Sequence, residues 1–223
     1  MATQPKLDEL NNIESKLSEI DYQKILKEFF DGMEISEEEK EKRLALANDL
    51  RAAILLFFGA MALGTALAQA DLALRVQSIA KQYSGKNIAY LNDYANRWAE
   101  KFADTTRKHK DDTDTITIEG VEIPNGEYWA SDMRATLAAE DIANAIANYE
   151  ELIEAFNNGK RYKTWVSQKD KRVRHTHREA DNQQRFLWEP FNVGGYEMMI
   201  PLDDNMGAPD EEIVNCRCVV KYS

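Results

Sequence analysis

Proline is missing from a long part of this chain: none lies between Pro5 and Pro124. A proline inside a helix removes a backbone donor and clashes with the preceding turn, so its absence leaves room for long helices. Apolar residues in this part recur every three or four positions, which is the spacing of one helix face. We therefore predict a mainly helical region over residues 1–110. The most aromatic of these faces consists of Tyr90, Leu91, Tyr94, Trp98 and Phe102.

Two helix boundaries can be located from capping residues. Ser36 followed by Glu39 is the pattern of a capping box, in which each side chain bonds the backbone of the other residue. It predicts a helix that begins after Ser36. Gly159 marks the end of a second helix, because glycine readily adopts the left-handed conformation that follows a helix. The apolar spacing before it predicts that this second helix covers residues 127–157.

Residues 52–68 are apolar on every side and are bounded by Arg51 and Asp71. A helix that crosses a bilayer needs about 17–25 residues of this kind, so the run is at the short end of the range. Its alanines and glycines suit close helix packing in protein as well as in lipid. Two interpretations stay open: a helix buried in a bundle or at an oligomer interface, and a helix that contacts a membrane.

Residues 111–223 carry shorter patterns than the helical region. Residues 115–118 and 121–123 alternate polar and apolar side chains around Glu119 and Gly120, which predicts a β-hairpin that leads into the long helix. Further β-prone segments lie at 162–166, 173–177, 196–200 and 218–222. The predicted fold class is α+β: a mainly helical N-terminal region, followed over residues 111–223 by a small α+β domain with short antiparallel strands.

The charge of the chain is uneven. A net charge of -11 opposes general binding to nucleic acid. Residues 160–178 differ, because they contain eight lysines and arginines and only one acid. Such a segment predicts a surface for DNA or an acidic partner, although charged side chains also protect sheet edges from aggregation. The candidate patch consists of Arg161, Lys163, Lys169, Lys171, Arg172 and Arg174.

Two histidines and both cysteines lie in this C-terminal part: His175, His177, Cys216 and Cys218. Residues two apart on an extended strand point to the same side, so these pairs would offer two imidazoles and two thiolates to a tetrahedral zinc ion. The cysteine spacing is unusual, because structural zinc sites separate paired cysteines by two to four residues. The alternative is no cofactor, with the cysteines buried as small apolar residues and the histidines on a polar surface.

Two catalytic arrangements fit parts of this pattern. His177 and Glu179 form an H-x-E, which in zinc deaminases pairs a ligand with a general acid–base, but the P-C-x-x-C of those enzymes is missing. Cys216 with His177 would make a nucleophile pair, yet no glycine-rich oxyanion loop adjoins it. Asp181 would hold the His177 ring in one tautomer through a hydrogen bond. We expect that the protein is not an enzyme, and the alternative is a metal-dependent hydrolase acting on nucleic acid.

The C-terminal part resembles the phage Mu F-like minor capsid, or head-morphogenesis, proteins. Their motif W-V-x-x-x-D-x-R-V-R-x-x-H runs here from Trp165 to His177, and residues 215–218, Asn-Cys-Arg-Cys, are similar to their closing motif. Residues 137–145 and 158–159 are similar to the A-x-T-E-x-x-x-A and N-G that precede the tryptophan. Some members end in P-x-H-P-N-C-R-C, whereas Val214 stands before the closing motif here. The site residues that carry the resemblance are Trp165, Arg174, His177, Asp181, Asn215, Cys216 and Cys218.

The resemblance implies a minor head protein of a tailed bacteriophage. Such proteins associate with the portal protein, a scaffold protein or the inner capsid during head assembly, and in some phages they assist genome packaging or ejection. The implied protein is oligomeric, and it is found in the virion and, during assembly, in the host cytoplasm. Residues 1–110 would then offer assembly and oligomerisation surfaces, and residues 111–223 would form the Mu F-like domain. Membrane contact through residues 52–68 would belong to genome delivery.

Overall fold

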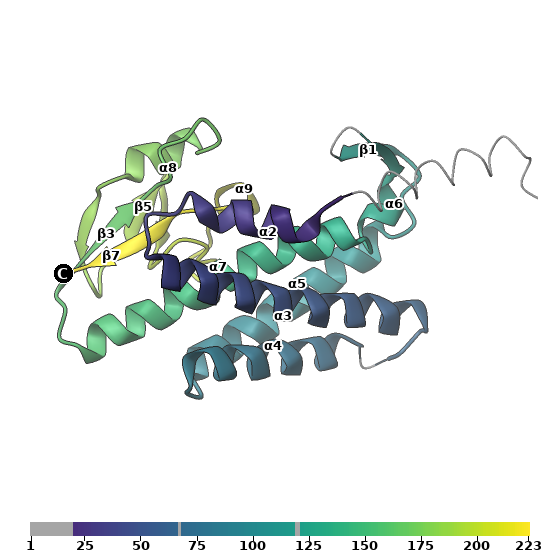
Figure 1. Cartoon of the computed structure of the whole chain (residues 1–223), viewed down its shortest axis with the longest axis horizontal. Coiled ribbons are helices and arrows are strands. Elements are labelled where there is room, and N and C mark those ends of the chain that lie inside the picture. Colours follow the sequence, from purple (N-terminus) through teal and green to yellow (C-terminus); the bar gives the residue numbers. More distant parts are fainter. Residues whose placement is uncertain (1–19, 67, 119–120) are drawn as a thin grey trace, which may run out of the picture.

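The computed structural model describes residues 20–66, 68–118 and 121–223. These residues form an α+β structure, in which helices dominate the N-terminal part and short antiparallel strands lie in the C-terminal part (Figure 1). The predicted fold class is therefore confirmed. Residues 1–19 of the predicted helical region, and the hairpin turn at Glu119 and Gly120, lie outside the described residues.

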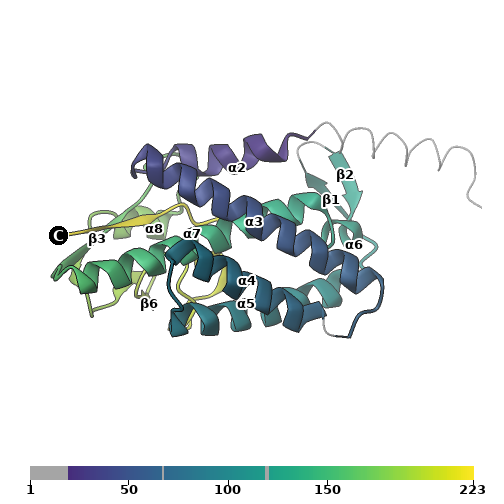
Figure 2. The same cartoon turned by 60° about the horizontal axis from the view of Figure 1, so that its bottom comes forward.

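Four helices make up the described part of the N-terminal region. They are α2 (Tyr22–Asp31), α3 (Glu37–Ala62), α4 (Ala68–Ser84) and α5 (Ala89–His109). The helix predicted after Ser36 is confirmed, because the Ser36 hydroxyl accepts a hydrogen bond from the Glu39 backbone N–H at 3.2 Å. Helix α4 packs against both α3 and α5 (Figure 2).

The apolar run of residues 52–68 is not one helix. Helix α3 ends at Ala62, the chain turns at Gly64 with a φ of 70°, and α4 begins at Ala68. Glycine takes this left-handed conformation without strain. Within the described residues, α3 is the one helix long and apolar enough to cross a membrane, a property that it shares with ordinary core helices. Its buried side chains in the run are Ala53, Ile54, Phe57 and Phe58.

The C-terminal part begins with the predicted hairpin and a long helix. Strands β1 (Thr115–Ile118) and β2 (Val121–Pro124) pair antiparallel. The single helix predicted over 127–157 is wrong at its start, where the structure has a short α6 (Asn125–Tyr128) and then α7 (Asp132–Asn157). The break arises because the Ser131 hydroxyl caps α7 by accepting a hydrogen bond from the Arg134 N–H at 3.2 Å.

A three-stranded antiparallel sheet follows, in the order β4-β3-β7. Its strands are β3 (Tyr162–Val166), β4 (Gln184–Phe186) and β7 (Val219–Tyr222). Trp165 of β3 pairs with Val220 of β7, so the strand that follows α7 and the strand near the end of the chain lie side by side in one sheet. A separate hairpin is formed by β5 (Phe191–Val193) and β6 (Tyr196–Met198), and two short helices, α8 (His175–Ala180) and α9 (Asp210–Ile213), complete the structure.

The strand predicted over 173–177 is wrong, because most of this segment belongs to α8. Both edges of β3 are already occupied, by β4 and by β7, so a further strand has no edge to join there. The chain also turns just before α8, where the Asp170 carboxylate accepts hydrogen bonds from the backbone N–H groups of Arg172 at 2.9 Å and Val173 at 3.2 Å. Such a turn competes with an extended backbone.

The apolar core is continuous across the boundary suggested at residue 110. Helix α7 packs against α2 and α3 on one side and against β7 on another. One cluster of buried side chains extends from Leu26 of α2 to Val220 of β7. Residue 110 therefore does not divide the described residues into two separate cores.

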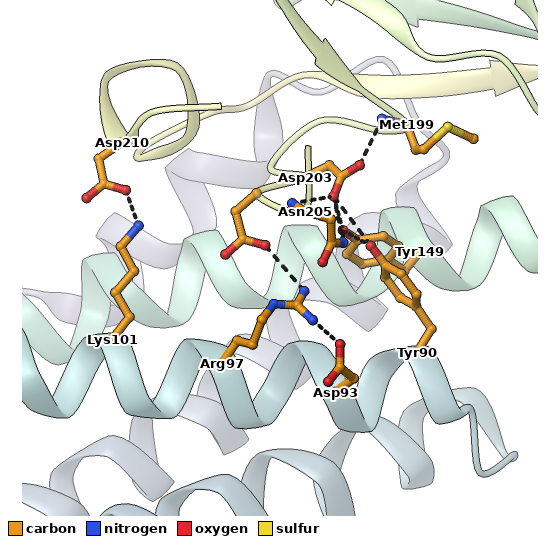
Figure 3. Close-up of polar contacts among 10 residues, drawn as sticks. Tyr90, Asp93, Arg97, Lys101, Tyr149, Met199, Asp203, Asn205 and Asp210 are labelled. Atoms are coloured by element: carbon orange, nitrogen blue, oxygen red, sulfur yellow. Dashed lines mark hydrogen bonds and ion pairs between the residues drawn. The ribbon is translucent and has the colours of Figure 1, made fainter. Parts of the chain in front are cut away.

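The loop between β6 and α9 is fastened to the helices by the buried carboxylate of Asp203 (Figure 3). Tyr149 donates its hydroxyl to this carboxylate at 2.7 Å, Asn205 its side-chain amide at 2.8 Å and Met199 its backbone N–H at 2.9 Å. Tyr90 of α5 donates to the Tyr149 hydroxyl at 2.8 Å. The Tyr90 hydroxyl also lies 3.4 Å from Asp203 Oδ1, so Asp203 joins the loop to both α7 and α5.

The variant Asp203→Ala is expected to lower the free energy of unfolding by about 1.5–3 kcal/mol, because buried donors lose a charged acceptor. Urea unfolding of the variant and the wild type measures this loss. Asp204→Ala is the matched control, since that carboxylate lies 3.4 Å from the partly exposed Arg97 and is expected to contribute less than about 1 kcal/mol. Equal losses in the two variants would contradict the role given to Asp203.

Candidate metal centre

Three side chains from two segments of the C-terminal part meet in the interior. His177 lies on α8, and Cys216 and Cys218 lie between α9 and β7. The Nδ1 atom of His177 is 3.5 Å from the Cys216 Sγ and 3.4 Å from the Cys218 Sγ. The exposed fractions are 2% for His177, 1% for Cys216 and 2% for Cys218. The two predicted motifs therefore come together in one buried cluster.

The cluster has the dimensions of a zinc site. Its three potential ligand atoms all lie within 4.8 Å of one another. Tetrahedral zinc binds nitrogen at about 2.0–2.1 Å and sulfur at about 2.3 Å, which places neighbouring nitrogen and sulfur ligands about 3.5 Å apart. The two Nδ1–Sγ distances match this separation. One imidazole and two thiolates are also a donor set that zinc prefers.

The pKa values of the three groups shift in different directions. Burial opposes ionisation of Cys216, but hydrogen bonds from Cys218 and His177 outweigh it and hold the pKa of the Cys216 thiol well below its usual value. The pKa of Cys218 is raised by its hydrogen bond to Cys216 and by burial. Burial lowers the pKa of His177, while Cys216 raises it, and the net shift is upward. The downward shift of the Cys216 pKa favours its thiolate, which is the form that binds metal.

His175 does not belong to the cluster, so this part of the predicted ligand set is wrong. On a helix, residues two apart point to nearly opposite sides. The His175 side chain is 78% exposed, and its Nδ1 lies 3.6 Å from Glu179 Oε2. Glu179, the acid of the H-x-E, is on the same exposed side, so it faces away from the cluster. The sequence pattern placed His175 beside His177 in the ligand set because residues 173–177 were predicted to form a strand.

Asp181 does not orient the His177 ring. Its carboxylate accepts a hydrogen bond from the Ser167 backbone N–H at 2.8 Å instead. The carboxylate beside the ring is that of Glu212, whose Oε2 lies 3.2 Å from the His177 Nε2 and accepts a hydrogen bond from the Thr176 hydroxyl at 2.7 Å. Glu212 was not predicted from the sequence, although the acidic residues 210–212 shortly before the cysteines could have indicated a carboxylate near the cluster.

The other residues of the resemblance surround the cluster. Trp165 is fully buried, and its ring meets the His177 ring edge-on with the centroids 5.6 Å apart. Asn215 has a φ of 58°, and its N–H donates to the Asp141 carboxylate at 3.0 Å. Arg174 donates to the Val214 carbonyl. Trp165 thus touches a metal-ligand candidate, while Asn215 and Arg174 hold the chain that leads into the cysteines.

The predicted basic patch is smaller than the sequence suggested. Lys163 is fully buried, donates to the Met199 carbonyl at 2.7 Å, and has its pKa lowered by burial to about 8. The Lys169 ammonium lies 3.0 Å from the Glu34 carboxylate. The patch residues that remain exposed are Arg161, Lys169, Lys171 and Arg172, and of these Lys169 is paired with Glu34. Lys163 is wrongly assigned to the patch, because period two in β3 puts it on the buried side with Trp165.

Comparisons with known proteins found no match: no family model, no curated protein and no solved structure matches the chain. The geometry of the described residues and the motifs in the sequence are therefore the basis for a functional proposal.

Proposed function

We propose that the protein is a minor head protein of a tailed bacteriophage, which binds the portal protein, a scaffold protein or the inner capsid surface during head assembly. In this proposal it is oligomeric, it assembles in the host cytoplasm and remains in the virion, and it is not an enzyme. The observation that supports the proposal most is the meeting of the two motifs. Trp165, His177 and Cys216 lie in one buried cluster although they are far apart in the sequence.

The proposal includes a structural zinc ion held by His177, Cys216 and Cys218. Such an ion would join α8 to the chain that enters β7, and the binding free energy would add to the free energy of folding. A cavity beside the cluster, lined in part by Gln168 and Val173, has a volume of about 10 Å³. That is room for about one water molecule, which would serve as the fourth ligand. Three protein ligands and one water are also the ligand set of catalytic zinc sites, so the structural role proposed here rests on the burial of the cluster and not on the number of ligands.

Burial favours this structural role over the alternative of a metal-dependent hydrolase acting on nucleic acid. A catalytic zinc ion keeps an open position for substrate. Here the three ligand candidates are each at most 2% exposed, and the adjoining cavity admits nothing larger than a water molecule. A nucleotide therefore has no path to the cluster in this conformation.

The surfaces of the chain fit an assembly role. The exposed Lys171 and Arg172 would meet DNA or an acidic shell protein, while the acidic remainder of the chain would repel nucleic acid. Burial of Ile54 and Phe57 in the core supports a packing role for the apolar residues 52–68 in preference to membrane contact.

The proposal predicts that a portal protein is encoded beside this chain, and co-expression with that portal protein tests it. A tagged portal protein is expected to retain the chain at a fixed ratio through size-exclusion chromatography, because minor head proteins bind it directly. Mass spectrometry of purified phage heads is expected to detect the chain. A portal protein from an unrelated phage serves as the control and should retain none. Failure to co-purify, together with absence from purified heads, would refute the proposal.

A further inference from the structure

A second cavity lies against α7, where Arg134, Ala138 and Asp141 form part of its wall. It is bounded by α5, by the segment that joins α6 to α7, and by the chain from residue 202 to residue 214. Its volume is about 270 Å³, and it is partly open to solvent. Small-molecule sites usually measure about 300–1,000 Å³, so this cavity accepts one aromatic group but is too small for a nucleotide. Its aromatic lining consists of Tyr94, Trp98, Phe102, Tyr128 and Trp129.

The wall of this cavity contains a cation without a partner. The Arg134 guanidinium packs on two rings, with its Cζ 4.5 Å from the Phe102 centroid and 4.9 Å from the Trp129 centroid. Among the described residues, its Nε has no hydrogen-bond partner. Burial lowers the pKa of Arg134, which reflects the cost of this arrangement. The N–H groups of the guanidinium are therefore what remains for a ligand.

The other charges of the cavity are already paired or partly used. Lys101 is paired with Asp210 (Figure 3). Arg97 is paired with Asp204, and both contacts fasten the loop to α5. Asp141 has one carboxylate oxygen that accepts from the Asn215 N–H at 3.0 Å, whereas its Oδ1 has no partner. The cavity therefore has two unsatisfied groups: the guanidinium of Arg134, which needs an acceptor, and Oδ1 of Asp141, which accepts a donor.

We propose that this cavity binds the C-terminal aromatic residue of a partner protein, with the free carboxylate on Arg134 and the ring between Trp98 and Trp129. A terminal tryptophan or tyrosine offers the three features that the cavity lacks: a carboxylate, a flat apolar body, and a ring N–H or O–H that can donate to Asp141. Charge-assisted bonds of this kind are about twice as strong as neutral ones. A polyphosphate or nucleic-acid strand fits less well, because the cavity of about 270 Å³ is too small for a nucleotide. The inference does not depend on the phage assignment.

N-acetyltryptophan and its amide are suitable probes, because they differ only in the charge of the terminal group. We expect the acid to bind about 10-fold or more tightly than the amide, since a hydrogen bond to a charged group is lost in the amide. Nuclear magnetic resonance titration of the full chain measures both affinities. The indole N–H signals of Trp98 and Trp129 should shift, while that of Trp188, which is 63% exposed and far from the cavity in sequence, serves as the control for unspecific stacking.

Two substitutions test the role of Arg134. Arg134→Gln should remove the preference for the acid, and Arg134→Lys should keep it, because lysine retains the charge. Trp98→Ala provides a second variant should Arg134→Gln fail to fold, and it should weaken binding of both probes. Equal affinity for the acid and the amide, no binding of either probe, or an unchanged preference in Arg134→Gln would each overturn the proposal. Because the probes are tested without the portal protein, these outcomes are separate from those of the head-assembly test.

Discussion

The variant Cys216→Ser is expected to lose the bound metal and a large part of the stability of the C-terminal part. Wild-type protein purified with zinc should contain about one zinc ion per chain, and the variant close to none, as measured by atomic emission spectroscopy. A ligand present at 1,000 times its dissociation constant stabilises the folded state by about 4 kcal/mol. We expect Cys216→Ser to lose about this much stability. A zinc ion would link His177 of α8 to Cys216 and Cys218 in the chain before β7, and the variant would lack this link.

Two comparisons separate loss of the metal from simple damage to the core. His175→Ala changes the exposed histidine of the same helix, so it should keep both the zinc content and the stability of the wild type. A strong chelator should lower the unfolding midpoint of the wild type to that of Cys216→Ser and leave the variant unchanged. Wild-type protein that holds no zinc after reconstitution, or a variant that holds as much as the wild type, would refute the metal centre.

Most of the fold follows from local patterns. Proline distribution, apolar spacing and the Ser36 cap predicted the helices, because these are properties of a single segment. The segments 162–166 and 218–222 were predicted as β-prone, and they pair as β3 and β7. The strand predicted at 173–177 was wrong for two reasons. The local one is the turn at Asp170, whose carboxylate accepts hydrogen bonds from the backbone of the next residues. The other reason is tertiary and cannot be seen in a local pattern: both edges of β3 are occupied by other strands.

The site was predictable to a similar extent. His177, Cys216 and Cys218 share a ligand chemistry, so their residue types alone suggested that they meet. His175 was assigned wrongly because its direction depends on whether α8 is a helix or a strand. Glu212 was missed because its place beside His177 depends on how α9 lies against α8. Lys163, in contrast, was within reach of sequence reasoning, since period two in a strand places it on the same side as Trp165.

Arg43→Ala is expected to lower the free energy of unfolding by about 3–5 kcal/mol, because it removes the buried cation of two ion pairs and leaves the carboxylates of Glu39 and Glu151 without it. Arg43 is fully buried, and its Nε donates to the Glu39 carboxylate of α3 at 3.0 Å. Its other nitrogens donate to Asn144 and Glu151 of α7. Asn144 in turn donates to the carbonyl of Cys216 at 3.0 Å. Loss of Arg43 should therefore disturb the packing of α3 on α7. It should also weaken the contact by which Asn144 holds the backbone at Cys216.

Lys42→Ala is the matched control for this prediction. Its ammonium lies 3.1 Å from Glu38, and both side chains are more than half exposed, so removing it should cost less than about 1 kcal/mol. The double variant Arg43→Met with Glu151→Met should recover part of the stability lost in Arg43→Ala, since an apolar pair can replace a buried ion pair. Denaturant unfolding measures all three variants. Should Arg43→Ala and Lys42→Ala unfold at the same denaturant concentration, the buried arginine would not be what holds α3 to α7. Apolar packing and the bonds from Arg51 of α3 to Asp132 and Thr136 of α7 would then have to account for their contact.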